Sequence, residues 1–414
     1  MKRVLMIAAQ YPPLKGSSGL QRVLKFSQYL PEHDWQPIML TPADIAHEQT
    51  SDEQLAEIPG SVLVRKAPAL DTKRHLSFLG RYPARLALPD RWASWWVGAV
   101  PLGLWLVRRY RPDAIWSTYP VASAHSIGGT ICRLSGLPWV ADFRDSMTEP
   151  GYPENPLIRQ SRLRVESRTV HRADRIIFTA ESALEMYARR YPEIDRSRWA
   201  VISNGYDEDN FARLEETPTT RTDSRITLVH SGLIDPSDRN PTAFFEAIAQ
   251  LKDSGQVSSE DVCINLRATG SNAHYLETVS QMGIDDIVRF TEMVPYNTAL
   301  QEMLSADGLI LFQGENCNHQ IPAKAYEYFR AGRPVLGFAD PAGDTGRLLH
   351  SAGVRHIAAL EDRAEVARVL SAFITEIRNQ SASGVDPATA RRYSRRSLTK
   401  NLADVLNVVS RNTS

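Results

Sequence analysis

The feature that most constrains the fold is a regular alternation of short apolar runs with longer segments of helical periodicity. In the first half of the chain the apolar runs are residues 3–9, 37–41, 61–65, 114–118, 139–143, 175–179 and 199–203. Helical patterns lie between them, for example at 19–30, 122–135, 156–172 and 182–191. Continuous apolar strands separated by helices predict a parallel sheet that is covered on both faces.

The second half repeats this pattern after a polar segment from Glu215 to Ser224. Its apolar runs are residues 226–229, 262–267, 287–290, 309–312, 334–338 and 355–358, with helical patterns between them. A length of 414 residues favours two domains. We therefore predict an N-terminal domain at 1–205, a linker at 206–224, a second α/β domain at 225–385 and a last helix within 386–414. Ligands of such sheets bind beyond the carboxyl ends of the strands.

Charge and cysteine content exclude several classes of protein. Forty-eight basic and 48 acidic residues cancel, so no broad field would attract nucleic acid. Cys132, Cys263 and Cys317 are far apart and lack the spacing of a zinc site, which favours reduced thiols in a cytoplasm. The apolar run near Met1 is too short for a signal peptide, so we interpret it as a first strand and expect a cytoplasmic protein.

One tryptophan-rich segment, residues 93–107, raises the question of a membrane. Fifteen residues are too few to span a bilayer, which needs about 20 in a helix. The segment is either a buried helix of the first domain or an interfacial helix. The second interpretation predicts a peripheral contact with the inner face of the cell membrane through Trp95, Trp96, Arg108 and Arg109.

The stretch 319–336 carries the strongest chemical pattern. Its helix is expected to start near Pro322 and to stop at Gly332. Lys324 and Glu327 are three residues apart, so they share one face near the helix N-terminus, where free N–H groups suit a phosphate. Glu327 can accept two hydrogen bonds from a ribose diol. The alternative is a surface Lys–Glu pair.

Two other glycine-containing loops follow strands. Gly16, Gly19 and Arg22 follow the first strand, and Gly232 and Arg239 follow the run 226–229. Glycines let backbone N–H groups approach an anion, and an arginine can hold a phosphate through two hydrogen bonds. The first loop lacks the GxGxxG spacing at the strand end, which argues against a nicotinamide cofactor.

Charged residues also end the strand 139–143, where Arg144 and Asp145 are expected to face a ligand or to form a structural ion pair. His125, at a helix start, is either a core or capping histidine or a general base. Asp207 and Asp209 form an Asp-x-Asp triplet of the kind that holds Mn²⁺ or Mg²⁺. Because the triplet follows an Asn-Gly turn, we interpret both as turn and cap residues.

Together, these motifs resemble the retaining glycosyltransferases of family 4. The resemblance rests on Ile-Pro-x-Lys-x-x-Glu-Tyr-x-x-x-Gly-x-Pro-Val from Ile321, on Asp-Phe-Arg-Asp at the end of the strand 139–143, and on the order of the loops. It implies the GT-B fold: two facing Rossmann-like domains with an interdomain cleft, and a last helix that crosses back to the first domain. The first of the family's two glutamates, eight residues before Glu327, is replaced by His319.

The resemblance also implies an activity. A sugar would pass from a nucleotide-diphosphate donor, with retention, to a hydroxyl of a glycan, a lipid-linked saccharide or a small molecule, and the leaving phosphate would accept the proton. Neither a metal nor another cofactor is expected. The implied catalytic residues are Arg144, Asp145 and His125, and the implied donor-binding residues are Gly16, Gly19, Arg22, Gly232, Arg239, His319, Lys324 and Glu327. The alternatives are a non-catalytic nucleotide-sugar-binding protein and a sugar-nucleotide epimerase.

Overall fold

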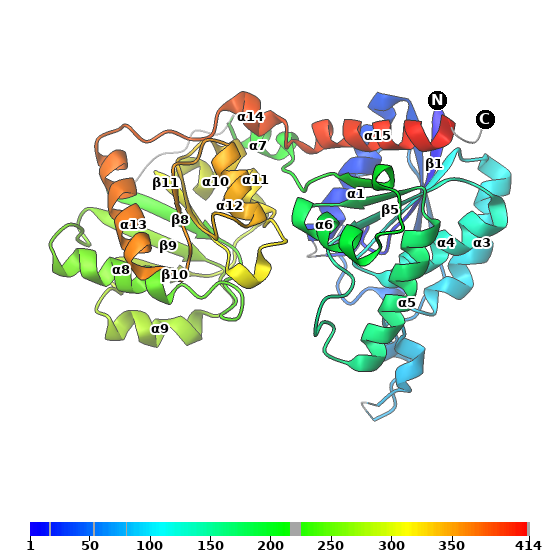
Figure 1. Ribbon diagram of the computed structural model, residues 1–414, viewed down its shortest axis with the longest axis horizontal. Coiled ribbons are helices and arrows are strands. Elements are labelled where there is room, and N and C mark those ends of the chain that lie inside the picture. The colour runs from blue at the N-terminus through cyan, green and yellow to red at the C-terminus, as the bar shows by residue number, and fades with distance from the viewer. Residues whose placement is uncertain (16–17, 53, 80, 216–224, 412–414) are drawn as a thin grey trace. The chain divides into compact units, whose positions relative to one another are not determined.

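The computed structural model describes residues 1–15, 18–52, 54–79, 81–215 and 225–411 (Figure 1). The chain forms two compact units. Unit 1 comprises Met1–Ser203 and the segment from Arg395 to the end of the described chain, and unit 2 comprises Asn204–Ser394. The predicted linker contains Tyr206, Asp207 and helix α7 (Glu208–Glu215), and its residues 216–224 lie outside the described part.

Unit 1 is built on a parallel sheet of seven strands in the order β3-β2-β1-β4-β5-β6-β7. The strands are β1 (Lys2–Ile7), β2 (Trp35–Pro42), β3 (Leu63–Ala67), β4 (Ala114–Thr118), β5 (Trp139–Arg144), β6 (Arg175–Phe178) and β7 (Trp199–Val201). The helices between them are α1 (Ser18–Tyr29), α2 (Thr72–His75), α3 (Trp95–Tyr110), α4 (Ala122–Ser135), α5 (Pro156–Arg172) and α6 (Glu181–Arg190). Every predicted strand of this half is present.

Both faces of this sheet are apolar because its strands carry large side chains at consecutive positions. Leu5 and Ile7 of β1 enter one core with helices α3 and α4, whereas Val4 and Met6 enter the core on the opposite face. Side chains of a strand alternate between the faces, so a continuous apolar run is needed to fill both cores. This explains why the strands could be located from the sequence.

The last helix belongs to unit 1, as the fold prediction required. It was expected as one helix within 386–414, but the structure has α14 (Pro387–Arg391) in unit 2 and α15 (Arg395–Arg411) in unit 1. The break falls where the Tyr393 ring packs against the rings of Tyr326 and Phe329, at centroid distances of 5.1 and 5.9 Å. Helix α15 then packs on α1 and buries Leu402 in the core of unit 1.

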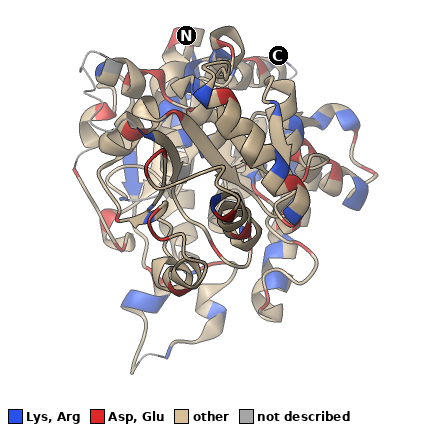
Figure 2. Cartoon of the chain, turned by 90° about the vertical axis from the view of Figure 1, so that its left-hand side faces the viewer, with Lys and Arg blue, Asp and Glu red and all other residues tan. Residues whose placement is uncertain are grey.

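Unit 2 has a parallel sheet of six strands in the order β10-β9-β8-β11-β12-β13. The strands are β8 (Ile226–Ser231), β9 (Val262–Arg267), β10 (Val288–Thr291), β11 (Gly308–Phe312), β12 (Val335–Phe338) and β13 (His356–Ala358). The remaining helices are α8 (Thr242–Asp253), α9 (Asn272–Gln281), α10 (Tyr296–Ser305), α11 (Lys324–Ala331), α12 (Asp344–Ser351) and α13 (Arg363–Arg378). Charges of both signs are spread over the helices and loops (Figure 2).

The tryptophan-rich segment forms α3, which continues through Pro101. Trp95 is fully buried in the core, so its predicted membrane contact is wrong: the helix turns this side chain toward the sheet. Trp96 is partly exposed, and its indole N–H donates to the hydroxyl of Thr130 at 3.1 Å. Across the described ranges, we find no helix with both the length and the apolar character needed to cross a bilayer.

Candidate functional site

The predicted residues of unit 2 gather at the carboxyl edge of its sheet. The strand order runs outward from β8 and β11 in opposite directions, so the chain reverses its winding between these two neighbours. Ligands of open parallel sheets bind at such a switch point. Gly232 and Arg239 follow β8, whereas His319, Lys324 and Glu327 follow β11. The loop after β8 and the loop after β11, both selected from the sequence, therefore lie at the switch point of this sheet.

Helix α11 is fixed at this edge by its buried face. Ala325, Tyr326 and Phe329 enter the core beneath it. The hydroxyl of buried Tyr328 accepts a hydrogen bond from the backbone N–H of Ser231, the last residue of β8, at 3.0 Å. The N-terminus of α11, where the helix dipole is positive, is thus held beside the end of β8.

Lys324 at the start of α11 reaches across to the loop after β8. Its Nζ lies 3.1 Å from Nε2 of buried His230. Gly232 has a φ of 108°, and a Cβ added there would lie 3.0 Å from the Lys324 Nζ. A side chain at position 232 would therefore be strained and would crowd the ammonium group. This close approach gives Gly232 a defined role.

His230 is neutral and its ring lies against the Lys324 amine. Burial, with the nearby Lys324 charge, holds the pKa of His230 well below its usual value. Its Nδ1 lies 2.9 Å from the carbonyl oxygen of Ile310, and its Nε2 lies 3.1 Å from the carbonyl oxygen of Gly232 as well as from the Lys324 Nζ. Burial and the Arg239 charge lower the pKa of Lys324 to about 7, although Glu327 opposes the shift. An anion bound here would favour the charged lysine.

Arg239 is held by a glutamine that the sequence analysis did not select. Its Nε donates to Oε1 of Gln313 at 3.0 Å, and Nε2 of the same buried amide donates to the Cys317 carbonyl at 3.1 Å. The backbone N–H of Gly314 donates to the Asp238 carbonyl at 2.8 Å. These bonds tie the loop after β8 to the loop after β11. A polar residue directly after a buried strand was the available signal for Gln313.

Glu327 also has a partner that no local pattern predicted. The hydroxyl of Tyr296, at the start of α10, donates to its Oε1 at 2.7 Å. Helices α10 and α11 pack side by side, which brings the two residues together across 31 positions of sequence. Tyr296 therefore orients the carboxylate that was predicted to bind a ribose.

His319 lies in the loop before α11, and the structure fixes this loop at both sides. The Asn318 carbonyl accepts from the backbone N–H of Asp344 at 2.9 Å, and the Gln320 carbonyl accepts from the Thr345 hydroxyl at 3.0 Å. Both partners begin helix α12. The half-buried His319 is thus held at the same edge as Lys324.

In unit 1, Arg144 ends β5 in a strained conformation. Its φ is 58°, next to a break in the β5–β6 register. The backbone N–H and the hydroxyl of Thr179 both donate to its carbonyl, at 3.2 and 2.9 Å. Its guanidinium is buried beside Gln10, and burial lowers the pKa of Arg144. A Cβ added to Gly19 would lie 2.1 Å from Nη1 of Arg144, which explains this glycine.

Arg22 lies inside unit 1. The guanidinium of Arg22 contacts both carboxylate oxygens of buried Asp142, at 2.9 and 3.1 Å, and donates to the carbonyls of Ile202 and Ser203. This set of bonds holds β5, α1 and the end of β7 together. Gly16 lies outside the described residues. Donor contacts of Gly16, Gly19 and Arg22 stay predictions.

His125 is buried on α4. Its Nδ1 lies 2.8 Å from the Ser117 hydroxyl, which also accepts from the Trp139 indole at 2.8 Å. The Ser117 hydroxyl thus contacts both rings. Burial lowers the pKa of His125 to about 3, so the ring is neutral. It lines a hollow of about 940 Å³ with Arg133 and Arg168. Half-buried Asp145 follows Arg144 directly.

Asp207 and Asp209 begin helix α7. Asp207 directly precedes the helix and Asp209 lies in its first turn, as their interpretation as turn and cap residues requires. Within the described residues, no group of three His, Cys, Asp or Glu side chains is arranged to hold a metal ion. Metal independence of the activity stays a prediction.

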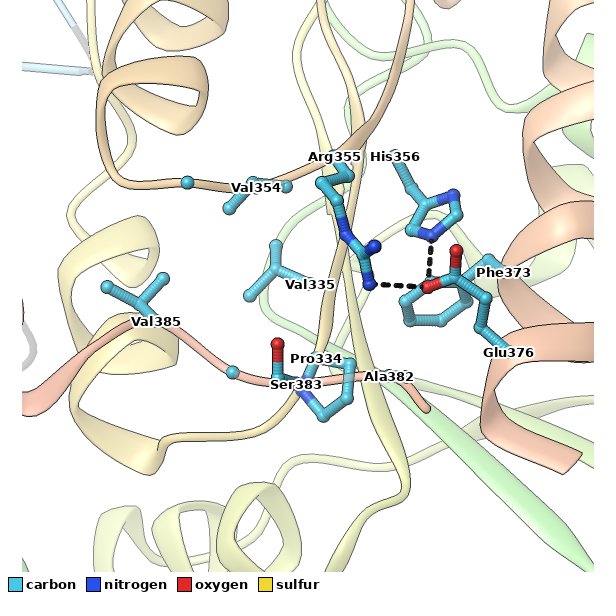
Figure 3. Close-up of a pocket in the computed structure, with 12 residues that line it drawn as sticks. Pro334, Val335, Val354, Arg355, His356, Phe373, Glu376, Ala382, Ser383 and Val385 are labelled. Atoms are coloured by element: carbon cyan, nitrogen blue, oxygen red, sulfur yellow. Dashed lines mark hydrogen bonds and ion pairs between the residues drawn. The ribbon is translucent and has the colours of Figure 1, made fainter. Parts of the chain in front are cut away.

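A hollow in unit 2 is too small for a nucleotide (Figure 3). It lies at the opposite edge of the sheet, where Val335 begins β12 and His356 begins β13. Glu376 lies 2.8 Å from Arg355 and 3.0 Å from His356 across it. Its volume is about 20 Å³, which holds about one water molecule. We exclude it as the site of a large ligand.

Comparison with known proteins supports the fold. Residues 19–205 match the model of a family described as "Glycosyl transferase 4-like domain". No curated protein sequence matches the chain. Among solved structures, Anabaena HepE in complex with UDP aligns over 99% of this chain and 100% of its own, with a TM-score of 0.64 and 16% identity.

Two further structures cover the whole chain. Sucrose-phosphate synthase from Thermosynechococcus elongatus aligns over 100% of this chain and 97% of its own, with a TM-score of 0.60 and 13% identity. A UDP-forming trehalose-phosphate synthase from Burkholderia vietnamiensis aligns over 100% of both chains, with a TM-score of 0.64 and 11% identity. The chain therefore has the GT-B fold, with two Rossmann-like units, and most of unit 1 matches a glycosyl transferase 4-like domain.

Proposed function

We propose that the protein is a retaining glycosyltransferase that takes a sugar from a nucleoside-diphosphate donor and needs no divalent metal. The observation that carries the proposal is the set of Lys324, Arg239 and Glu327 at the switch point of unit 2. Two cations suit the two charges of a diphosphate, and a carboxylate one helical turn away suits a ribose diol. HepE structures with UDP and with UDP-glucose support a nucleotide-sugar ligand.

The chemistry assigned to these residues is stabilisation of a leaving group. As the bond between the sugar and the diphosphate breaks, negative charge grows on the phosphate beside Lys324 and Arg239. The leaving phosphate accepts the proton of the acceptor hydroxyl, so no strong protein base is required. Arg144 and Asp145 are proposed to contact the sugar or the acceptor, with neutral His125 as a further candidate. The acceptor is a saccharide, a lipid-linked saccharide or a small molecule.

A panel of nucleotide sugars tests this proposal. We expect one donor to bind and to be transferred, or slowly hydrolysed, in the presence of excess EDTA. Activity that is lost in EDTA and restored only by Mn²⁺ or Mg²⁺ would contradict metal independence. The replacement of the family's first glutamate by His319 favours one rival function, a non-catalytic nucleotide-sugar-binding protein. Binding without turnover would support this rival, and formation of an epimer would identify an epimerase.

Variants separate donor binding from chemistry. Glu327→Ala should weaken donor binding by about 1.5–3 kcal/mol, the range of a hydrogen bond to a charged group. Lys324→Ala and Arg239→Ala should lower turnover more than binding, because leaving-group charge is larger in the transition state. Arg289→Ala, an exposed arginine on β10, is the matched control. If all the folded variants turned over like wild type, the donor site would lie elsewhere.

A further inference from the structure

We propose that residues 72–79 and 81–86 of unit 1, which we call the basic loop, bind the surface of a membrane that contains anionic lipids. The basic loop runs from α2 to the short 3₁₀ turn Ala84–Ala87 and projects from the unit (Figures 1 and 2). It is distinct from the predicted contact at Trp95 and Trp96. The inference does not depend on the proposed sugar transfer, because lipid binding is measured without a donor.

The tip of the basic loop exposes large apolar side chains. Phe78 is 80% exposed and its neighbour Leu79 is 87% exposed, so neither is packed against the described chain. Leu76, Tyr82 and Leu86 are exposed in the same segment. Exposed apolar residues scattered singly are ordinary, but five within 11 positions form a patch that marks an interaction surface.

The backbone presents these side chains in a defined turn. Phe78 and Arg81 exchange hydrogen bonds between their backbone N–H and carbonyl groups, at 2.8 and 3.0 Å. At the base, the Thr72 hydroxyl lies 3.0 Å from each of the carbonyls of Leu86 and Arg91. These bonds tie the two ends of the basic loop to each other and to Arg91, which lies outside the loop. The apolar tip is therefore built into the fold and is no loose tail.

The charge of the basic loop selects an anionic partner. Lys73, Arg74, Arg81 and Arg85 lie in it, and no acidic residue occurs between Asp71 and Asp90. The whole chain is neutral, so this local excess of four positive charges is specific to the segment. Arg81 and Arg85 are exposed, and neither makes an ion pair with a described residue. In Figure 2 the projecting segment carries blue but no red.

The combination of exposed apolar and basic side chains in the basic loop fits a bilayer interface better than it fits a nucleic acid. Apolar tips enter the boundary between headgroups and acyl chains, while guanidinium groups stay level with the lipid phosphates. A nucleic acid would satisfy Arg81 and Arg85 but would leave Phe78 and Leu79 in water. A lipid surface satisfies both kinds of side chain at once.

Flotation of the full-length protein with vesicles tests the inference. We expect binding to vesicles of phosphatidylcholine mixed with phosphatidylglycerol, weaker binding at high salt, and little binding to phosphatidylcholine alone. Each basic residue at an anionic surface contributes about fivefold to binding, so Arg81→Glu with Arg85→Glu should weaken it at least ~25-fold. Phe78→Ser with Leu79→Ser should abolish flotation at every salt concentration.

A matched control removes two exposed apolar side chains elsewhere, Leu276→Ser with Val408→Ser, and should bind like wild type. All these positions are exposed, so thermal unfolding should change little and loss of binding cannot be ascribed to misfolding. Equal flotation of wild type and both basic-loop variants would refute the inference. It would equally be refuted by self-association that Phe78→Ser with Leu79→Ser removes, without vesicle binding, which would assign the patch to a second copy of the chain.

Discussion

The pKa of Lys324 makes donor binding depend on pH in a calculable way. Burial and the Arg239 charge lower this pKa to about 7, so about half of the free protein carries a neutral lysine at pH 7. A diphosphate beside Nζ requires the charged form, since only the ammonium group offers the needed charge. Binding must therefore be coupled to proton uptake.

The magnitude follows from a single titration. The apparent dissociation constant rises by the factor 1 + 10^(pH − pKa), which is about 2 at pH 7 and about 30 at pH 8.5 for the pKa of Lys324. We expect affinity for the nucleoside diphosphate to fall by roughly 16-fold between these pH values. The phosphate itself, with a second pKa near 6, contributes little over this range. At pH 7, binding should take up about half a proton.

Isothermal titration calorimetry measures both quantities. Titrations at pH 7 and 8.5 give the change in affinity, and titrations at pH 7 in buffers of different ionisation enthalpy give the proton uptake. Lys324→Arg is the matched control because its charge persists throughout this range, so the variant should bind with nearly constant affinity. A wild-type affinity that is flat from pH 7 to 8.5, without proton uptake, would refute the role of Lys324.

Three further predictions concern single positions. Gly232→Ala should lower the free energy of unfolding by about 1–3 kcal/mol and weaken nucleotide binding, measured by denaturant titration and calorimetry, because φ is 108° and its Cβ would crowd Lys324. Tyr296→Phe should weaken donor binding by about 0.5–1.5 kcal/mol through loss of its bond to Glu327; unchanged affinity would show that the bond does not orient this carboxylate. His125 has a folded pKa near 3, below its unfolded value, so its contribution is complete above pH 6.5 and is lost as pH falls toward 3, by up to about 4–5 kcal/mol. Urea titrations at several pH values should show a shallower acid slope for His125→Asn than for wild type.

The fold was predictable because each strand buries apolar side chains on both faces. Strands β4 and β9 begin and end where the sequence placed them, and helices α4 and α5 do as well. The break between α14 and α15 was not predictable, because it depends on the packing of the Tyr393 ring against residues over 60 positions away. A local helical pattern contains no information on such a contact.

The candidate site was predictable only where function imposes a local pattern. Lys324 and Glu327 share a helix face, and Gly232 follows a strand, so spacing alone drew attention to them. Gln313 and Tyr296 contact these side chains from other elements, and their importance appears only when β11 and α10 are placed. His230 could not be selected from the sequence, because its contact with Lys324 joins residues that are 94 positions apart. Residues that are distant in sequence and meet only in the folded protein leave no periodic pattern in the sequence.

The division of unit 1 into two separated segments has a consequence for biosynthesis. Its core includes Leu398, Leu402 and Leu406, which are synthesised after all of unit 2. Unit 2 is therefore fully synthesised, and free to fold, before unit 1 has all of its parts. The backbones of Tyr206 and Ser394 pair near the two ends of unit 2, so that unit resembles an insertion with adjacent entry and exit points. A chain that stops before Arg395 would lack these core residues of unit 1 but would contain the whole sequence of unit 2.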